Sequence, residues 1–353
     1  MEQPLPPYGS CLLGSVNLTE FVENPFQDNV EFNFKKLKKV IAIFNRMLDN
    51  VCEINGLTVE KQSDEMLLKR RHGIGILGLG SMLCMMKIKY DSKEALELTE
   101  KIMQLITITS YKVGVELAKE KGKAPIFETE DYLEKYVKSK FIQSVLPSEL
   151  IDEIKIHGIR YTHAISVAPT GSIALSFANN ASNGIEPSFM HYYQRNVIVQ
   201  GKNTKIQEDV YSYELLVYNM LINENIPDYF QTANSISPKA HIDMMCLVQK
   251  YVDSSISKTV NVPTEISFEE FKDLYLYAYD NGAKGCTTYR YNPDNQLGVL
   301  VNNEDLKNTK YKITLNDGTE LVLSADKKIN YDNDIHNVGN LCDSIIEGLY
   351  GKY

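Results

Sequence analysis

The sequence lacks a long apolar run, an excess of positive charge and closely spaced cysteines. Spanning a bilayer takes about 18 or more consecutive apolar residues, and residues 1–4 have neither the basic nor the apolar region of a signal peptide. We therefore expect a cytoplasmic protein with no membrane partner. The net charge of −9 disfavours a nucleic-acid polymer as partner, because surfaces that bind one present an excess of Lys and Arg to its phosphates.

The cysteines and histidines show no spacing typical of a metal site or of a disulfide framework. No CxxC pair occurs, no histidine stands at zinc-finger distance from a cysteine, and neither HxxxH nor HExxH is present. We expect reduced thiols and no bound metal ion. The cysteines are Cys11, Cys52, Cys84, Cys246, Cys286 and Cys342.

What the sequence does contain is typical of a globular protein. Its 353 residues are 43% hydrophobic and 24% charged, which suits two domains or one large α/β domain. Apolar residues recur at helical spacing over 34–51 and predict an amphipathic helix. A second helix is predicted over about 91–121, with Asp91 and Glu94 as its capping box and Gly122 as its end.

The later part of the chain alternates between strands and helices. Strands are predicted over 164–168, 259–262 and 284–289. A helix lies between the last two and begins with a capping box of Ser267 and Glu270. A strand, a helix and a strand at this spacing imply a parallel crossover, so the predicted fold class is α/β.

The C-terminal part differs in character. After about residue 292 the chain becomes polar, and two short strands over 312–315 and 320–324 flank an Asn-Asp-Gly-Thr turn typical of a β-hairpin. A short helix is predicted over 341–349. We therefore expect a main domain over 1–300 and a small appended α+β module over 301–353.

A glycine run matches the dinucleotide fingerprint GxGxxG at Gly73, Gly75 and Gly78. The fingerprint has meaning only after a strand and before a helix, and residues 69–72 do not read as a strand. We consider close helix packing through small residues the better interpretation. An ordered strand leading into Gly73 would favour a nicotinamide-dependent dehydrogenase, whereas a helix there would exclude one.

A second motif, Pro169-Thr170-Gly171-Ser172, lies between a predicted strand and a predicted helix. Free N–H groups at a helix start favour an anion, and the hydroxyls of Thr170 and Ser172 can add donors. A plain turn with a serine cap is the alternative. Cys11 and Glu2 carry no local signal: such a cysteine is more often a small buried hydrophobe, and a terminal glutamate is normally a solvated charge.

Several segments, taken in order, resemble the C-terminal portion of a ribonucleotide reductase catalytic subunit over roughly residues 2–300. The first runs from Glu2 to Leu18 and resembles the segment that follows the family's active-site Asn-x-Cys-x-Glu. The others are Arg71–Gly80, Ala118–Phe127, Ala168–Ile173, Asn183–Pro187 and Ser255–Asn261. The resemblance implies the later part of a ten-stranded α/β barrel, made of two parallel half-sheets around a finger loop.

The resemblance also implies a reaction, in which hydrogen replaces the 2′-hydroxyl of a ribonucleotide substrate through a cysteine thiyl radical. Glu2 matches the glutamate that takes the proton of the 3′-hydroxyl. Cys11 matches one of the two cysteines that reduce the substrate and end as a disulfide. Thr170, Gly171 and Ser172 match the loop that holds the substrate phosphates.

The implied cofactor is adenosylcobalamin. Family members that receive their radical from a metal-bearing subunit have two adjacent tyrosines near the last barrel strand, whereas Tyr289 and Tyr291 are separated here. The segment is more similar to the adenosylcobalamin-dependent class. Many family members end in a cysteine pair, and only Cys342 lies in the C-terminal module. We expect an external dithiol reductant, either thioredoxin-like or glutaredoxin-like.

By this resemblance the thiyl cysteine and the partner of Cys11 would precede Glu2, where only Met1 stands. We therefore expect a split reductase completed by a complementary N-terminal fragment, and a truncated form remains an alternative. Two other functions stay open: a non-catalytic assembly or binding subunit of the same fold, and the dehydrogenase built on the glycine run.

Overall fold

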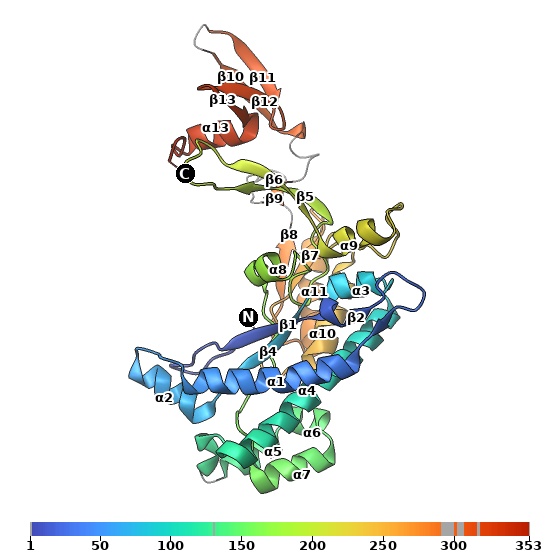
Figure 1. Ribbon diagram of the computed structural model, residues 1–353, viewed down its shortest axis with the longest axis vertical. Helices are drawn as coiled ribbons and strands as arrows, with labels where there is room; N and C mark the ends of the chain where they lie inside the picture. The colour runs from blue at the N-terminus through green and yellow to red at the C-terminus, as the bar shows by residue number, and fades with distance from the viewer. Residues whose placement is uncertain (1, 130, 291–299, 302–306, 316–317, 353) are drawn as a thin grey trace. The chain divides into compact units, whose positions relative to one another are not determined.

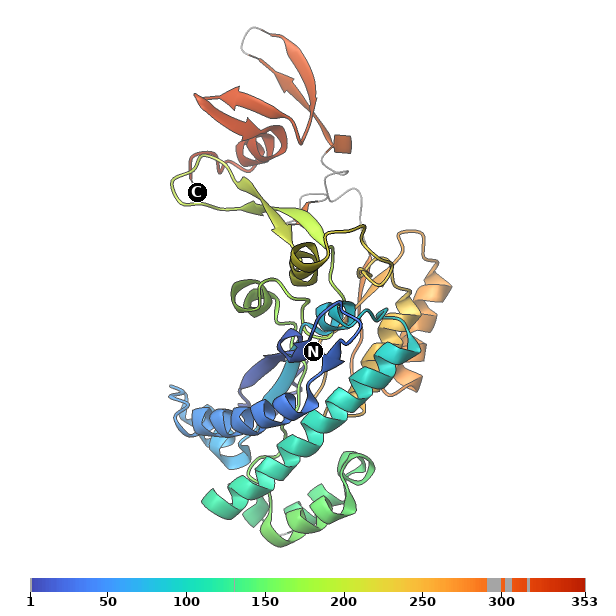
Figure 2. The same cartoon turned by 45° about the vertical axis from the view of Figure 1, so that its right-hand side comes forward.

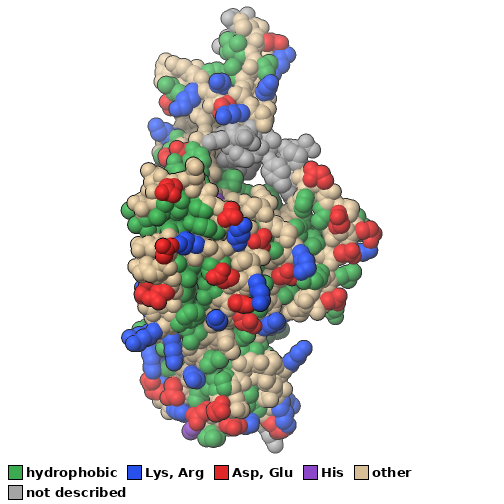
Figure 3. Space-filling view, turned by 90° about the vertical axis from the view of Figure 1, so that its right-hand side faces the viewer, with side chains coloured by type: hydrophobic (Ala, Val, Ile, Leu, Met, Phe, Trp, Pro, Cys, Tyr) green, Lys and Arg blue, Asp and Glu red, His purple; other side chains and the backbone are tan. Residues whose placement is uncertain are grey.

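A computed structural model describes residues 2–129, 131–290, 300–301, 307–315 and 318–352. The chain forms two compact units, residues 1–189 with 213–290 and residues 190–212 with 291–353. The division into domains at residue 300 stays a prediction. No helix in these described ranges is long and apolar enough to cross a membrane. Acidic and basic side chains are interspersed over the face shown in Figure 3.

Parallel strands form the centre of the first unit (Figure 1). β1 (Leu13–Asn17) pairs in parallel with β4 (Gly73–Leu77), and β7 (Thr259–Val262) pairs in parallel with β8 (Thr287–Arg290). Isolated parallel bridges join Ile74 to Ile165 and Val167 to Ile256. The spatial order is therefore β1, β4, residues 164–168, residues 254–262 and β8.

This order confirms the predicted α/β class. β7, α11 (Phe268–Asp280) and β8 form the predicted parallel crossover, and Ser267 and Glu270 make both hydrogen bonds of the capping box. Residues 164–168, predicted as a strand, take part only through single bridges. Within the described residues the strands do not close into a barrel.

Helices flank the strands, as Figures 1 and 2 show. α1 (Phe34–Glu53) is the predicted amphipathic helix. α4 (Lys93–Lys121) begins later than predicted, because Ser92 caps it by accepting a 3.1 Å hydrogen bond from the N–H of Ala95. Asp91 accepts a 3.0 Å hydrogen bond from Gln231 instead.

The other elements of this unit are mostly short. The remaining α-helices are α2 (Glu60–Lys69), α3 (Leu79–Met85), α5 (Tyr132–Val137), α6 (Lys140–Val145), α7 (Ser148–His157), α8 (Gly171–Phe177), α9 (Tyr213–Leu221) and α10 (Pro238–Gln249). Two 3₁₀ helices, η1 (Leu18–Phe21) and η2 (Pro125–Glu128), and a small antiparallel pair, β2 (Val22–Glu23) and β3 (Glu31–Phe32), complete it.

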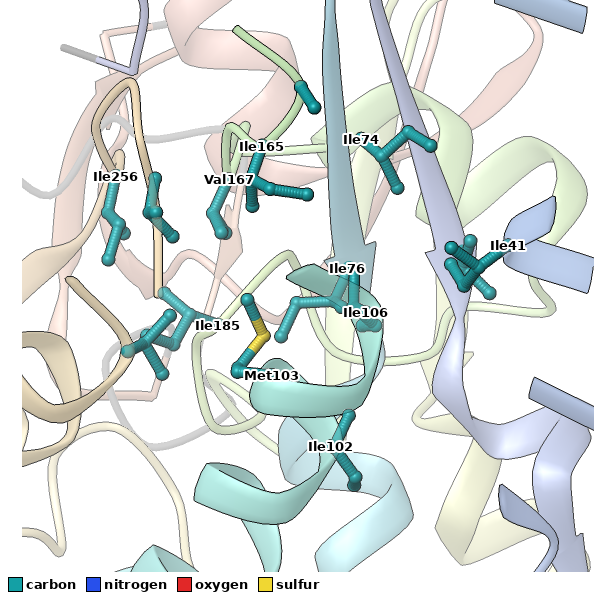
Figure 4. Close-up of a cluster of buried hydrophobic side chains, with 14 of the residues drawn as sticks. Ile41, Ile74, Ile76, Ile102, Met103, Ile106, Ile165, Val167, Ile185 and Ile256 are labelled. Carbon is teal, nitrogen blue, oxygen red and sulfur yellow. The ribbon is translucent and has the colours of Figure 1, made fainter. Parts of the chain in front are cut away.

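The hydrophobic core lies between β4 and the helices α1 and α4 (Figure 4). Ile74 and Ile76 of β4 are fully buried with Ile41 of α1 and with Ile102 and Ile106 of α4. Successive side chains of a strand point to opposite faces. The odd-numbered residues of β4 therefore face away from this core, toward the other side of the strands.

Gly73 and Gly75 lie within β4 and Gly78 follows as the N-cap of α3, whereas α2 ends at Lys69 shortly before the run. A dinucleotide fingerprint needs a strand that leads into its first glycine, and none precedes Gly73, so the dehydrogenase interpretation is wrong. A Cβ on Gly75 would lie 2.4 Å from the carbonyl oxygen of Ser166. Gly75 thus allows close approach of a neighbouring segment, in place of the helix packing predicted for the run.

The described residues of the second unit include three antiparallel strand pairings and the helix α13 (Val338–Ile346). β5 (Tyr192–Val197) pairs with β6 (Ile206–Tyr211) and with β9 (Leu300–Val301). The predicted hairpin is confirmed as β10 (Lys310–Thr314) with β11 (Glu320–Ser324), although Asn316 and Asp317 of its turn lie outside the described residues. β12 (Lys328–Tyr331), β13 (Asp334–Asn337) and α13 (Val338–Ile346) complete the unit.

Candidate functional site

Two hydrogen bonds hold the backbone of Glu2 beside the parallel strands. Its carbonyl oxygen accepts hydrogen bonds from the N–H of Ser255 at 3.0 Å and from Oγ of Ser166 at 2.7 Å. The amide of Gln3 packs where Gly73 has no side chain, since a Cβ there would lie 2.7 Å from Nε2 of Gln3. The predicted catalytic glutamate therefore lies on the face of the strands opposite the helical core.

Cys11 stands just before β1 and is exposed. Partial desolvation raises the pKa of its thiol, the charge of Glu2 raises it further, and the charge of Arg71 lowers it. The pKa of Cys11 thus responds to the charges of two residues, Glu2 and Arg71. Arg71 was not singled out as a site residue from the sequence.

The predicted phosphate loop precedes α8. Thr170 has a left-handed backbone conformation with a φ of 58°. Its Oγ1 accepts a 2.8 Å hydrogen bond from the N–H of Gly184, so this hydroxyl already holds a neighbouring loop. Gly171 and Ser172 are exposed at the start of the helix. The first N–H groups of a helix have no partner inside it, which suits an anion there.

A buried ion pair anchors the loop that Thr170 contacts. Lys258 is almost fully buried, and its Nζ donates to a carboxylate oxygen of Glu186. Nζ also lies 2.9 Å from Nδ1 of His241, whose Nε2 faces the carbonyl oxygen of Ala233 at 2.9 Å. The Nε2 atom therefore carries the proton and Nδ1 accepts from Lys258.

A backbone hydrogen bond adds to the ion pair of Lys258 and Glu186. The N–H of Thr259 donates a 2.5 Å hydrogen bond to Glu186, which ties the loop to the start of β7. Burial lowers the pKa of Lys258, and the neighbouring charge of Glu186 raises it. Sequence reasoning placed Glu186 and Lys258 only inside family-like segments, and a lysine and a glutamate so far apart give no local signal of pairing.

The segment that contacts Glu2 also leads to the predicted phosphate loop. Ser166 contacts Glu2, and Thr170 follows four residues later, about 13 Å further at roughly 3.3 Å per extended residue. The structure thus holds the backbone of Glu2 beside Ser166 and places Thr170, Gly171 and Ser172 at the carboxyl end of the same segment, whereas Cys11 precedes the start of β1. Ligands of parallel α/β sheets bind in that region.

Comparisons with known proteins identify the family of the chain. A family model described as ribonucleotide reductase, barrel domain, matches residues 1–289. A vitamin B12-dependent ribonucleoside-diphosphate reductase of Thermoplasma acidophilum is 32% identical over 306 residues, covering 82% of this chain and 36% of the relative. The enzyme of the same name from Mycobacterium tuberculosis is 29% identical over 307 residues, covering 82% and 40%.

A vitamin B12-dependent ribonucleotide reductase of Streptomyces coelicolor is 23% identical over 369 residues, which cover 91% of this chain and 38% of the relative. The chain therefore spans well under half the length of these relatives. The match over residues 1–289 confirms the resemblance seen in the sequence. On these grounds, the chain belongs to the family of the ribonucleotide reductase barrel domain.

Proposed function

We propose that this chain is the C-terminal part of the catalytic barrel of an adenosylcobalamin-dependent ribonucleotide reductase, an oxidoreductase that makes deoxyribonucleotides. The observation that carries the proposal is the placement of Glu2. Its carbonyl oxygen is held by Ser166 and Ser255, and Ser166 lies on the segment that leads to the phosphate loop. The parallel strands β1, β4, β7 and β8 would then belong to one half-sheet of a ten-stranded barrel.

In the proposed reaction, each residue has a separate task. The carboxylate of Glu2 accepts the proton of the substrate's 3′-hydroxyl, which favours loss of the 2′-hydroxyl as water. Cys11 and a second cysteine supply the hydrogen that replaces it, and their two thiols become one disulfide. The N–H groups at the start of α8 and the hydroxyl of Ser172 hold the phosphates. An external dithiol then reduces the disulfide.

Adenosylcobalamin, when bound, supplies an organic radical by homolysis of its cobalt–carbon bond. The carboxyl ends of β7 and β8 contain side chains that suit such a group. Tyr289 is exposed and stands opposite Asn261 in the parallel register. An aromatic ring packs on a flat apolar macrocycle, and an amide can bond to amide groups on its rim. We assign these two residues as contacts of the cofactor.

Reconstitution tests the proposal. The part of the relatives that this chain does not span would be supplied as a separate polypeptide, because the family's thiyl cysteine belongs to that part. We expect reduction of a radiolabelled ribonucleotide only when both polypeptides, adenosylcobalamin and a dithiol are present. Turnover by this chain alone would contradict the proposed division of the site. Absence of turnover in every combination would favour a non-catalytic assembly subunit.

The phosphate loop gives a graded prediction. Ser172→Ala removes one hydroxyl donor and is expected to weaken nucleotide binding by about 1–2 kcal/mol, which calorimetric titration of the reconstituted enzyme would measure. Ser144→Ala serves as control, because its hydroxyl donates to the carbonyl of Phe141 within a short helix. Unchanged affinity in the Ser172 variant would show that this serine lies at the start of the helix without binding phosphate.

A further inference from the structure

Arg71 is a charged residue to which the proposed reaction gives no role. Its Nη1 donates a 3.2 Å hydrogen bond to the carbonyl oxygen of Pro4, in the segment that carries Glu2. Its Nε is buried and has no hydrogen-bond partner among the described residues. A guanidinium has five N–H donors and stays charged at all ordinary pH values, so a buried unpaired donor needs an explanation.

The strand register explains where Arg71 points. In the parallel ladder Leu13 is opposite Gly73, and the N–H of Gly73 donates a 2.9 Å hydrogen bond to the carbonyl of Leu12. Continuing this register two residues before the ladder would bring Cys11 opposite Arg71. Side chains two residues apart share a face, and this face is the one on which Gln3 packs against Gly73.

We propose that Arg71 is a positioning residue for the redox cysteine, holding its guanidinium beside the sulfur of Cys11 so that the thiolate is stabilised during disulfide exchange. This inference rests on the proposed function of Cys11. When an external dithiol attacks the disulfide, one S–S bond breaks, a new one forms to the attacking sulfur, and Cys11 can leave as a thiolate. The dithiol provides two electrons and two protons and becomes a disulfide.

The charges of Glu2 and Arg71 have opposite effects on the pKa of the Cys11 thiol. Glu2 raises the pKa of Cys11 beyond the effect of desolvation, and Arg71 lowers it. Burial lowers the pKa of Arg71. The charges of Asp253, Glu65, Tyr132 and Cys11 each raise it. A low pKa of the leaving thiol speeds disulfide exchange. Arg71 therefore offsets the unfavourable field that the catalytic carboxylate imposes on the cysteine beside it.

The test measures the thiol directly and needs no turnover. Iodoacetamide labelling of this chain between pH 6 and pH 10, resolved by peptide mass spectrometry, gives the alkylation rate of Cys11. Arg71→Met is expected to lower that rate at neutral pH by about 3- to 10-fold and to shift its pH profile upward, while Arg71→Lys keeps most of the rate. Glu2→Gln is expected to raise the rate. Misfolding of Arg71→Met would also raise it, because unfolding exposes the thiol and removes the desolvation that raises its pKa, so a lower rate in that variant does not come from misfolding.

Cys342 lies in the second unit and is the internal reference, since its rate should stay constant in all variants. Equal Cys11 profiles in the wild type, Arg71→Met and Arg71→Lys would overturn the inference. The outcome is separable from the proposed function. Full turnover by a reconstituted Cys11→Ser variant would reject the redox role of Cys11, whatever the labelling rates are.

Discussion

Replacing Glu2 by glutamine is expected to lower turnover of the reconstituted enzyme by roughly 10²–10⁴-fold. Glutamine keeps the length and hydrogen-bonding reach of the side chain but cannot accept a proton from the 3′-hydroxyl. The backbone contacts of Glu2 with Ser166 and Ser255 use its carbonyl oxygen, so the substitution leaves them in place. Steady-state reduction of a radiolabelled nucleotide gives the size of the loss.

The comparison with Cys11→Ser makes this result specific. That variant keeps the base but lacks a reductant, so the reaction should begin, lose water and release free base in place of deoxynucleotide. Glu31→Gln is the matched control for Glu2→Gln, because Glu31 is an exposed carboxylate on β3. Wild-type turnover in both Glu2→Gln and Cys11→Ser would show that the match to the family's active site is structural only.

Replacing Asp49 by asparagine is expected to destabilise the first unit by about 3–5 kcal/mol. The Asp49 carboxylate is fully buried and lies 2.6 Å from Nη2 of Arg70, 3.1 Å from Nε of Arg160 and 3.3 Å from Nζ of Lys121. Burial by itself raises the pKa of Asp49, but the hydrogen bond and charge of Arg70, with the charge of Arg160, hold it below its usual value.

The expected loss of stability follows from the charges that would remain after the Asp49→Asn substitution. Without the Asp49 charge, the two buried guanidinium groups keep Glu53 as their carboxylate partner, and that side chain is 44% exposed. An uncompensated buried charge is costly, whereas loss of a partly exposed one costs about 1 kcal/mol or less. Urea unfolding should therefore separate Asp49→Asn from the control Glu53→Gln. A loss below about 1 kcal/mol in Asp49→Asn would contradict this account.

Local patterns in the sequence were sufficient for much of the fold. The periodicity of α1 and the capping box of α11 depend on residues within a few positions of each other, and both are present as predicted. The hairpin of β10 and β11 depends on a short turn and was also predicted correctly. The hairpin of β12 and β13 was missed, although Asp332 and Asn333, with φ of 56° and 64°, are typical of such a turn.

For the candidate site as well, the sequence indicated some features and only the structure showed others. The resemblance supplied Glu2, Cys11 and the loop from Thr170 to Ser172, because those residues lie in short family-like segments. It supplied no geometry, and only the structure showed that the hydroxyl of Thr170 is engaged by Gly184. The roles of these residues in catalysis remain predictions until the variants described above are measured.

The sequence by itself determined the α/β class, the parallel crossover and the residues matching the reductase family. The tertiary structure decided what the glycine run does and which residues neutralise the buried charges. Gly73 meets Gln3, Lys258 meets Glu186 and Arg160 meets Asp49 across long stretches of chain. The physical reason is that helix periodicity and capping act within a few residues, whereas ion pairs and close packing depend on which distant segments the fold brings together.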